Sequence, residues 1–365
     1  MSKLYMPVCI YQEENCIRKY GHEMRNLGKH AFIVTGKHSA KANGSLADVQ
    51  TVLKELGISC TVFDEIEENP SIETCERARE TGLNAGVDFV IGIGGGSPLD
   101  AAKAIALLLG NPSESGEVFY KEKPLSYLPV VEVPTTCGTG SEVTPYAILT
   151  IHAKRTKQSI SHKIYPKLAF CDSRYLESAS SSIIVNTAVD ALCHLIESYF
   201  NTNSNQANRM YSTYGLQFWG MAKDNLIKNI MGRETGSLLM EASTYAGMAI
   251  THTGTSLPHA LSYCITYELG IPHGKACGIF LTGYLRLCQE KMSQEVSKVM
   301  ELLGMKDLHD FAEMMENLIG EKESINARIP EEIRKKTVEG VMANPKKLKN
   351  CPFEVTDKDL YQMFL

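Results

Sequence analysis

The first half of the chain alternates short apolar runs with amphipathic segments, a pattern typical of strands that are each followed by a helix. The apolar runs are continuous, which favours strands buried on both faces of a parallel sheet that is covered by helices. The predicted strands cover residues 29–35, 60–63, 88–93 and 129–133. The predicted helices between them cover residues 46–56, 71–85 and 101–109.

After about Arg174 the strand-like runs fade, and apolar positions recur at helical spacing. Helices are predicted at 183–201, 206–230, 234–252 and 256–269, with further helices from 275 to 365. Because 365 residues are long for one hydrophobic core, the pattern predicts two domains. We place an α/β domain at residues 1–174 and an all-α domain at residues 175–365.

Composition narrows the class of protein and its partners. Hydrophobic residues make up 44% and charged residues 22% of the chain, as expected for a globular protein with a substantial core. The net charge of −5 comes without a basic stripe, which argues against nucleic acid or an anionic membrane as partner. We expect no membrane-spanning run, and residues 1–10 do not resemble a signal peptide. The eleven cysteines are odd in number and contain no C-x-x-C pair, which favours reduced thiols and a cytoplasmic location.

The stretch from Asn186 to Glu197 places a carboxylate and an imidazole four residues apart. On the helix predicted there, Asp190 and His194 lie on one face, about 5–6 Å apart at Cβ. Such a pair on a buried face is either a hydrogen-bonded core pair or half of a metal site. Glu197 is either a carboxylate that orients the His194 ring or a surface acid.

Two further histidines stand near predicted helix boundaries. His259 follows Ser256, which suits the N-cap of a new helix, and His273 follows a glycine–proline break. One continuous helix would separate the two imidazoles by roughly 21 Å, so the chain must turn if they are to share an ion. One carboxylate and three imidazoles suit a divalent ion such as iron(II) or zinc(II). We interpret the nearby cysteines as small buried apolar residues rather than ligands. They are Cys193, Cys264 and Cys277.

A glycine-rich segment, GGGSPLD at 94–100, follows one predicted strand and precedes a helix. Three glycines expose backbone N–H groups to a bulky anion, and a helix N-terminus favours negative charge. We take Ser97 as the N-cap, Pro98 as the first helical residue and Asp100 as part of a capping-box-like start. The segment lacks the G-x-G-x-x-G fingerprint, so a simple tight turn stays open beside a phosphate site.

A second loop, TTCGTGS at 135–141, ends the next predicted strand and is dense in hydroxyl groups. These hydroxyls either bind phosphate, ribose or an amide, or they belong to a polar surface turn. Two such loops at the carboxyl ends of neighbouring parallel strands mark where ligands of open α/β sheets bind.

Five motifs occur in order along nearly the whole chain: GGGSPLDAAKAIA, PTTCGTGSEVTPYAILT, VDALCHLIES, LPHALS and GIPHGKACG. As a set they resemble the iron-containing (group III) alcohol dehydrogenase family, and within it the NADP-linked butanol and 1,3-propanediol dehydrogenases. The resemblance implies a Rossmann-like dinucleotide-binding domain, a helical metal-binding and substrate domain, and the fold shared with dehydroquinate synthase. It implies a homodimeric, NAD(P)-dependent enzyme that uses Fe(II) or Zn(II) to interconvert small primary alcohols and aldehydes.

The resemblance also assigns roles by position. The implied metal ligands are Asp190, His194, His259 and His273. The implied pyrophosphate residues are Gly95, Gly96, Ser97 and Asp100. The residues that would line the nucleotide cleft are Thr135, Thr136, Thr139 and Ser141, with Asn69 at the adenosine half and Lys157 at the nicotinamide ribose. Many members carry a histidine where this chain has Tyr263, so we expect Tyr263 to border the substrate and to pass its proton outward.

The loop after the first predicted strand bears on the choice of nucleotide. An acid at such a strand end commonly binds the adenosine ribose and repels a 2′-phosphate, but here no acid follows until Asp48. Gly36 leaves room, and Ser39 can donate a hydrogen bond. Lys37 and Lys41 supply positive charge. The loop therefore predicts NADP(H) over NAD(H), unless its two lysines belong to an ordinary solvated turn.

Other functions compete with this interpretation. A lyase of the dehydroquinate synthase type needs several basic residues for a phosphorylated substrate, and residues 240–280 offer only Lys275. A polyol dehydrogenase on the same fold is the second enzymatic alternative. A non-catalytic metal or nucleotide-binding regulator would have no need of a complete ligand set beside two nucleotide loops.

Overall fold

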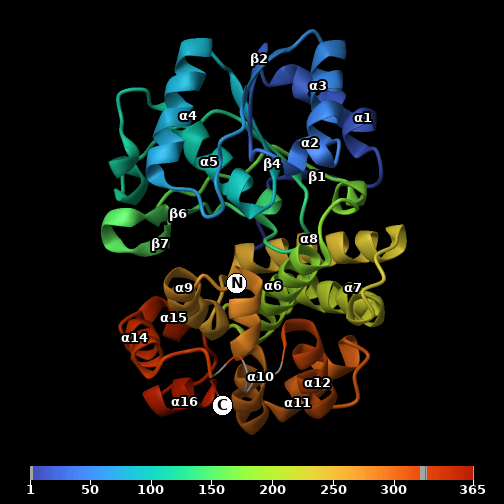
Figure 1. Ribbon diagram of the computed structural model, residues 1–365, viewed down its shortest axis with the longest axis vertical. Coiled ribbons are helices and arrows are strands. Elements are labelled where there is room, and N and C mark those ends of the chain that lie inside the picture. The colour runs from blue at the N-terminus through green and yellow to red at the C-terminus, as the bar shows by residue number, and fades with distance from the viewer. Residues whose placement is uncertain (1–2, 321–324, 326, 365) are drawn as a thin grey trace. The chain divides into compact units, whose positions relative to one another are not determined.

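The apolar runs of the first half form a parallel sheet of six strands among the described residues, in the order β1-β8-β5-β4-β2-β3 (Figure 1). The strands are β1 (Cys9–Gln12), β2 (His30–Thr35), β3 (Ser59–Phe63), β4 (Phe89–Gly94), β5 (Val130–Pro134) and β8 (Leu168–Cys171). The four predicted strands are confirmed. The structure adds β1 and β8, whose four-residue runs are too short to stand out, and an antiparallel hairpin of β6 (Ile148–Ile151) and β7 (Thr156–Ser159).

The computed structural model describes residues 3–320, 325 and 327–364, and these fall into two units. The sheet unit comprises Met6–Thr136 and Gly140–Ala179. The helical unit comprises the described residues from Ser180 onward, the short stretch Cys137–Thr139, and the N-terminal residues up to Tyr5.

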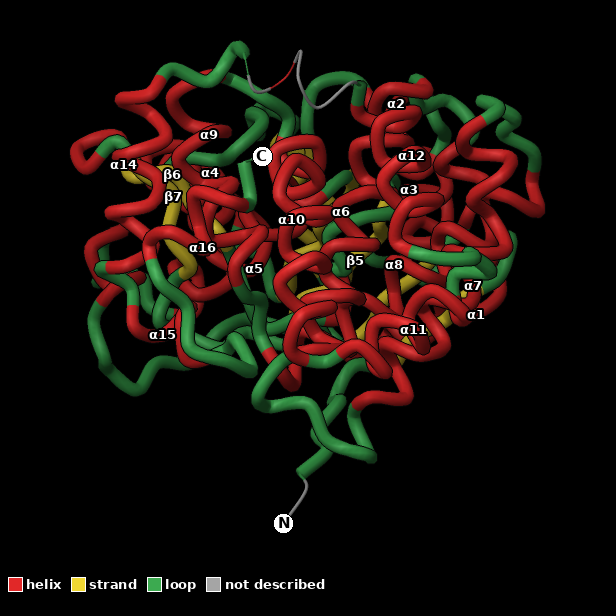
Figure 2. Tube along the Cα trace, turned by 90° about the horizontal axis from the view of Figure 1, so that it is seen from below, coloured by secondary structure: helices red, strands yellow, loops and turns green. Residues whose placement is uncertain are grey.

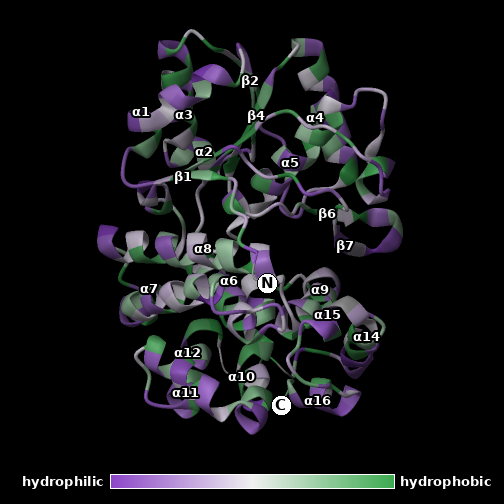
Figure 3. Cartoon of the chain, turned by 180° about the vertical axis from the view of Figure 1, so that it is seen from behind, coloured by the Kyte–Doolittle hydropathy of each residue, from purple (hydrophilic) through white to green (hydrophobic). Residues whose placement is uncertain are grey.

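Helices cover both faces of the sheet, as a buried parallel sheet requires. Alternate residues of β2 point to opposite sides, so that Phe32 and Val34 join one core while Ala31 and Ile33 join the other. The first core is closed by α4 (Ile72–Ala85) and α5 (Gly96–Gly110), and the second by α1 (Cys16–Tyr20) and α3 (Ser45–Glu55) (Figure 1). The inner strands β2 and β4 appear as hydrophobic ribbon in Figure 3.

Two local predictions for this unit are wrong. The segment expected to be loop after β2 contains the helical turn α2 (Ser39–Ala42). Helix α5 begins at Gly96, with Gly95 as its N-cap, rather than at residue 101. Because glycine has no side chain to cap a helix, the backbone N–H groups of this first turn stay available to a ligand. Short 3₁₀ turns occupy Gly21–Asn26, Gly116–Tyr120, Ser141–Val143, His152–Lys154 and Ser173–Leu176.

The helical unit is built around α6 (Ser181–Phe200), which is buried from Ala188 to its end. Helices α7 (Arg209–Ile227), α8 (Arg233–Thr253) and α10 (His273–Lys291) pack against it (Figure 2). The other helices among the described residues are α9 (Leu257–Leu269), α11 (Ser293–Leu302), α12 (Leu308–Ile319), α14 (Glu331–Met342), α15 (Pro345–Lys349) and α16 (Asp357–Gln362). The four long helices predicted between residues 183 and 269 are therefore confirmed, as are further helices among the described residues after 275. Residues 321–324, 326 and 365 of that last prediction lie outside the described residues.

Among the described residues, α6 alone is long and apolar enough to cross a membrane by length and composition. This corrects the expectation that no run reaches such a length. However, 78% of its most apolar stretch is buried inside the protein. That burial accounts for the apolar sequence, since a central helix has neighbours on every side.

Candidate functional site

The four predicted donors of the helical unit come together, and Asp190 is at their centre. Its Oδ1 lies 3.2 Å from His259 Nε2, 3.8 Å from His273 Nε2 and 3.9 Å from His194 Nε2. The rings of His194 and His259 stack with centroids 4.3 Å apart. We call Asp190, His194, His259 and His273 the donor cluster. Helix α6 supplies its first two members, and the first turns of α9 and α10 supply the others.

The turn that brings His273 back to the cluster is the predicted glycine–proline break. Helix α9 ends at Gly270, which has a left-handed φ of 65° that favours glycine. Pro272 then forms the N-cap of α10. The turn brings His273 back along α9, and its ring centroid lies 5.4 Å from that of His259, which one continuous helix would not allow.

Two of the imidazoles are held by an acceptor on the ring nitrogen that faces away from Asp190. His194 Nδ1 lies 3.3 Å from the carbonyl oxygen of Gly138, and His259 Nδ1 contacts Glu197 Oε2. An acceptor on Nδ1 orients each ring so that its Nε2 faces Asp190. Both Nε2 atoms are thereby prepared to donate an electron pair to a cation.

Glu197 has a different partner from the one expected. It is fully buried and orients His259, whereas the sequence suggested His194 or solvent. Its Oε1 also accepts hydrogen bonds from the backbone N–H groups of Ser256, at 3.0 Å, and His259, at 3.1 Å. This carboxylate from α6 therefore caps α9, while the Ser256 side chain makes no capping bond.

The pKa shifts of Asp190, His194 and Glu197 agree with a role in binding a cation. Burial alone would raise the pKa of the Asp190 carboxyl, but the three surrounding imidazoles lower it. Burial lowers the pKa of His194 to about 4. Burial would likewise raise the pKa of Glu197, and the charge of His259 instead lowers it. The cluster thus holds ionised carboxylates and a neutral imidazole near pH 7, which are the forms that bind a metal ion.

Cys277 is interpreted from the sequence as a small buried apolar residue, but its thiol lies among polar groups of the donor cluster. Cys277 is fully buried, and its Sγ lies 3.8 Å from His273 Nε2. Burial would raise the pKa of this thiol, but neighbouring His259 and His273 lower it to about 7. The signal in the sequence was its position four residues after His273, the same spacing that pairs Asp190 with His194.

Tyr263 lies one helical turn after His259, where it stacks on His273. The two rings are parallel within 2°, with centroids 5.9 Å apart. The ammonium group of Lys347 also lies over the Tyr263 ring, with Nζ 5.8 Å from the ring centroid. The His273 side chain is 32% exposed, in contrast to the other donors, so the cluster is most accessible on the side that these two rings border.

In the sheet unit, the two predicted nucleotide loops are neighbours. The N–H of Thr135 donates to the carbonyl of Gly94 at 2.8 Å. A Cβ added to Gly95 would lie 3.1 Å from Thr136 Cγ2, so only glycine fits there without a shift. The predicted Thr139 belongs instead to the helical unit, with the stretch Cys137–Thr139.

Three predicted cofactor residues from distant parts of the sequence meet through Asn69. Its N–H donates to Ser97 Oγ at 3.0 Å, and its Oδ1 accepts from Lys157 Nζ at 2.6 Å. Ser97 is therefore not the N-cap of α5, because its hydroxyl serves this contact. Asn69 itself has a φ of 60°, a left-handed conformation that asparagine tolerates better than most residues.

The Asp100 side chain connects the two loops through hydrogen bonds. Its Oδ1 accepts from Ser141 Oγ at 2.5 Å, and its Oδ2 accepts from the backbone N–H of Ile148 at 2.8 Å. Lys103, fully buried, donates to the Ser141 carbonyl at 2.6 Å. Asp100 and Ser141 thus hold the loops in position through their side chains, rather than forming the expected capping box.

The loop after β2 has an acidic neighbour that the linear sequence did not indicate. Gly36 is half-buried, and Lys37 and Ser39 are exposed, as expected for residues that face a ligand or solvent. Lys41, however, forms an ion pair of 2.5 Å with Asp64, which follows β3. Strands β2 and β3 are parallel neighbours, so their carboxyl ends bring the lysine and the acid together.

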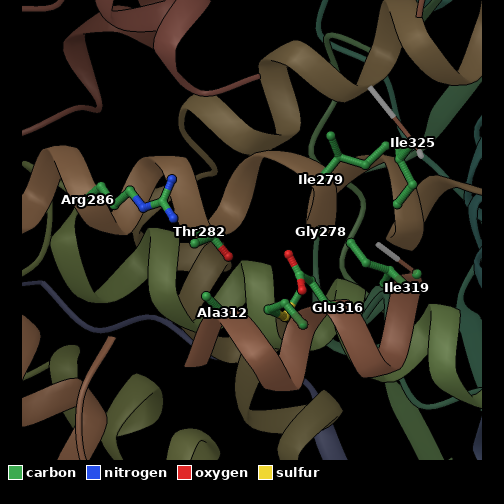
Figure 4. Close-up of a pocket in the computed structure, with 10 residues that line it drawn as sticks. Gly278, Ile279, Thr282, Arg286, Ala312, Glu316, Ile319 and Ile325 are labelled. Atoms are coloured by element: carbon green, nitrogen blue, oxygen red, sulfur yellow. The ribbon is translucent and has the colours of Figure 1, made fainter. Parts of the chain in front are cut away.

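A small cavity of about 30 Å³ lies elsewhere in the helical unit (Figure 4). Gly278, Thr282 and Arg286 of α10 face Ala312 and Glu316 of α12 across it. No member of the donor cluster lines this cavity, and its volume suits a water molecule rather than a substrate.

Comparison with known proteins covers both halves of the chain. Residues 7–173 match the family model described as iron-containing alcohol dehydrogenase. Residues 184–360 match the model of the C-terminal part of the Fe-containing alcohol dehydrogenase family.

Individual relatives agree with these matches. The NADPH-dependent butanol dehydrogenase of Clostridium saccharobutylicum is 26% identical over 336 residues, which cover 90% of this chain and 84% of that protein. An iron-containing alcohol dehydrogenase from Thermotoga maritima is 38% identical, with a TM-score of 0.90 over 100% of this chain and 98% of that one. The sulfoacetaldehyde reductase of Bifidobacterium kashiwanohense, solved in complex with NAD+, is 25% identical, with a TM-score of 0.88 over 100% and 98% of the two chains.

The contact of Glu197 with His259 generates a prediction. Replacing Glu197 with glutamine removes the carboxylate that orients the His259 ring, and we expect the affinity for a divalent metal ion to fall about 10–100-fold. The measurement is zinc binding in competition with a chelator. Glu241→Gln, at a half-buried acid on α8, is the matched control and should leave the affinity unchanged. Equal affinities in both variants would mean that Glu197 only caps α9.

Proposed function

This chain belongs to the iron-containing alcohol dehydrogenase family and is an alcohol dehydrogenase, and we propose that it reduces small aldehydes to primary alcohols with NADPH at a metal ion held by the donor cluster. The observation that carries the proposal is the convergence of three Nε2 atoms on Asp190 Oδ1, each within 4 Å. A set of one carboxylate and three imidazoles fits Fe(II) or Zn(II). When bound, a divalent ion supplies Lewis-acid polarisation of the reacting oxygen.

Each unit has its own part in the proposed reaction. In the sheet unit, the N–H groups at the start of α5 bind the pyrophosphate, and the Asn69 network positions the ribose side through Ser97 and Lys157. A bound nicotinamide would supply the hydride for the carbonyl carbon. In the helical unit, Gly138 and Glu197 orient the rings of His194 and His259 through Nδ1, so that each Nε2 faces the proposed metal site. We keep the boundary between the dinucleotide-binding domain, 1–174, and the metal-binding and substrate domain, 175–365, as part of this proposal.

The function is tested by removing donors. His259→Ala and His273→Ala should each lose bound metal and lower kcat/KM for butanal at least about 100-fold, because each removes one ligand of a small set. Metal content and the oxidation of NADPH are measured on the same samples. His252→Ala is the matched control, since this histidine of the helical unit bonds the Met248 carbonyl and lies outside the donor cluster. Metal-free variants that keep wild-type turnover would refute the metal-assisted mechanism.

Tyr263 is proposed as the group that passes a proton between solvent and the substrate oxygen, inward during aldehyde reduction and outward during alcohol oxidation, because its ring borders the accessible side of His273. Tyr263→Phe keeps the ring but removes the hydroxyl, so kcat should fall and its pH dependence should change. Tyr267→Phe, one helical turn further along α9, is the control. A pH–rate profile identical to that of the wild type would make Tyr263 only a wall of the substrate site.

The preference for NADP(H) is proposed from the loop after β2. Gly36 leaves space for a 2′-phosphate, while Lys37 and Ser39 are exposed beside it. The ion pair with Lys41 lowers the pKa of the nearby Asp64 carboxyl but also compensates its charge. Relatives named for either cofactor exist, since one is described as NADPH-dependent and another was solved with NAD+.

The nucleotide prediction is measured as the ratio of kcat/KM for NADPH to that for NADH. We expect a ratio above one in the wild type and a fall of about tenfold or more in Gly36→Asp, because the new carboxylate repels the 2′-phosphate. Gly36→Asn has the same size without the charge and should change the ratio less. A wild-type preference for NADH, or an unaltered ratio in Gly36→Asp, would show that this loop does not bind the 2′-position.

We also propose that the enzyme is a cytoplasmic homodimer. The odd number of cysteines, without a C-x-x-C pair, favours this location. An apolar stripe on α7 favours association with a second copy, because Met210, Tyr214 and Met221 are 43%, 52% and 64% exposed on one helical face. Light scattering distinguishes one copy from two.

A further inference from the structure

We infer that Cys277 is a ligand of the metal ion, and that its thiolate biases the site toward zinc(II) over iron(II). The inference rests on the proposed metal site, and it adds a sulfur donor to the carboxylate and the imidazoles that the family resemblance implies. Its basis is the way in which α10 approaches α6.

Two glycines bring the first turns of α10 against α6. A Cβ on Gly274 would overlap the carbonyl oxygen of Asn186, and a Cβ on Gly278 would lie 2.7 Å from Val189 Cγ1. The two helices are therefore in backbone contact at the level of Asp190. Cys277 lies between these glycines on the same part of α10, so its short side chain is carried into the space between the helices.

Within that space the sulfur occupies a position that suits a ligand. One donor atom each from Asp190, His259, His273 and Cys277 all lie within 4.8 Å of one another. A sulfur and a nitrogen ligand bound to zinc at ordinary bond lengths, with a tetrahedral angle between them, are about 3.6 Å apart. The observed 3.8 Å between Cys277 Sγ and His273 Nε2 is close to that separation. Among the described residues, this group of four is the one with donor atoms at such mutual distances.

The other two cysteines near the donor cluster do not have their sulfur atoms among the converging donor atoms. Cys193 is fully buried next to His194 in the chain, yet it is absent from the group of converging donors. Cys264 follows Tyr263 directly and is partly exposed. Of the three cysteines that the sequence places near the ligands, Cys277 alone has its sulfur among the nitrogen and oxygen donors.

Sulfur changes which ion the site prefers. Thiolate is a soft ligand that zinc(II) binds strongly in combination with imidazole, whereas carboxylate and imidazole alone also suit iron(II). A chain with cysteine at this position should therefore retain zinc more tightly, relative to iron, than the same chain without it. The alternative role of Cys277 is a hydrogen bond to His273 that supports the ring without touching the ion.

The test is X-ray absorption spectroscopy of the full-length protein loaded with zinc. We expect about one sulfur neighbour at roughly 2.3 Å in the wild type, beside nitrogen and oxygen neighbours at about 2.0–2.2 Å. Cys277→Ser should lose the sulfur neighbour, and Cys193→Ser should keep it. Cobalt(II)-loaded protein gives a second measurement, because the sulfur-to-cobalt charge-transfer absorption in the near ultraviolet should be present in the wild type and absent from Cys277→Ser.

Metal competition completes the experiment. After anaerobic dialysis against equal zinc(II) and iron(II), the zinc-to-iron ratio should fall at least about tenfold in Cys277→Ser compared with the wild type and with Cys193→Ser. A wild-type spectrum with one bound zinc and no sulfur neighbour would overturn the inference and leave the proposed function intact. Failure of the wild type to bind metal, with turnover retained, would overturn both.

Discussion

The buried carboxylate of Glu197 is the interaction on which the donor cluster depends. A charge with no exposed surface costs several kcal/mol in desolvation unless its environment compensates it. Here two backbone N–H groups at the start of α9 and the ring of His259 do so. One side chain of α6 therefore fixes where α9 begins and how its first imidazole is turned. Loss of this carboxylate would release both the helix end and the ring.

The sheet unit uses a carboxylate in the same way. Asp100 accepts hydrogen bonds from Ser141 and from the backbone of Ile148, and thereby joins the two glycine- and hydroxyl-rich loops. Lys103, which has no exposed surface, adds a third hydrogen bond by donating to the carbonyl oxygen of Ser141. In each unit a carboxylate accepts a hydrogen bond from backbone near the predicted site residues, Glu197 in the helical unit and Asp100 in the sheet unit. A buried acid in such a protein has a structural and a chemical role at once.

Close packing of small residues decides what surrounds the donors. The glycines of α10 allow its backbone to touch α6, which places His273 and Cys277 beside Asp190. Larger residues at these positions would separate the helices and leave the donors too far apart for one ion. The distances within the cluster thus depend on residues that have no ligand atoms of their own.

The sequence by itself determined the features that depend on neighbours along the chain. Apolar runs predicted the four central strands and the long helices, and the four-residue spacing placed Asp190 beside His194, because helix geometry is local. Tertiary structure alone decided the partners of groups that are distant in sequence. Glu197 faces His259 rather than its own neighbour His194, and Asp64 meets Lys41 because β2 and β3 end side by side. A side chain on a helix has several faces available to it, and only the packing of the next helix or strand determines which contacts it makes.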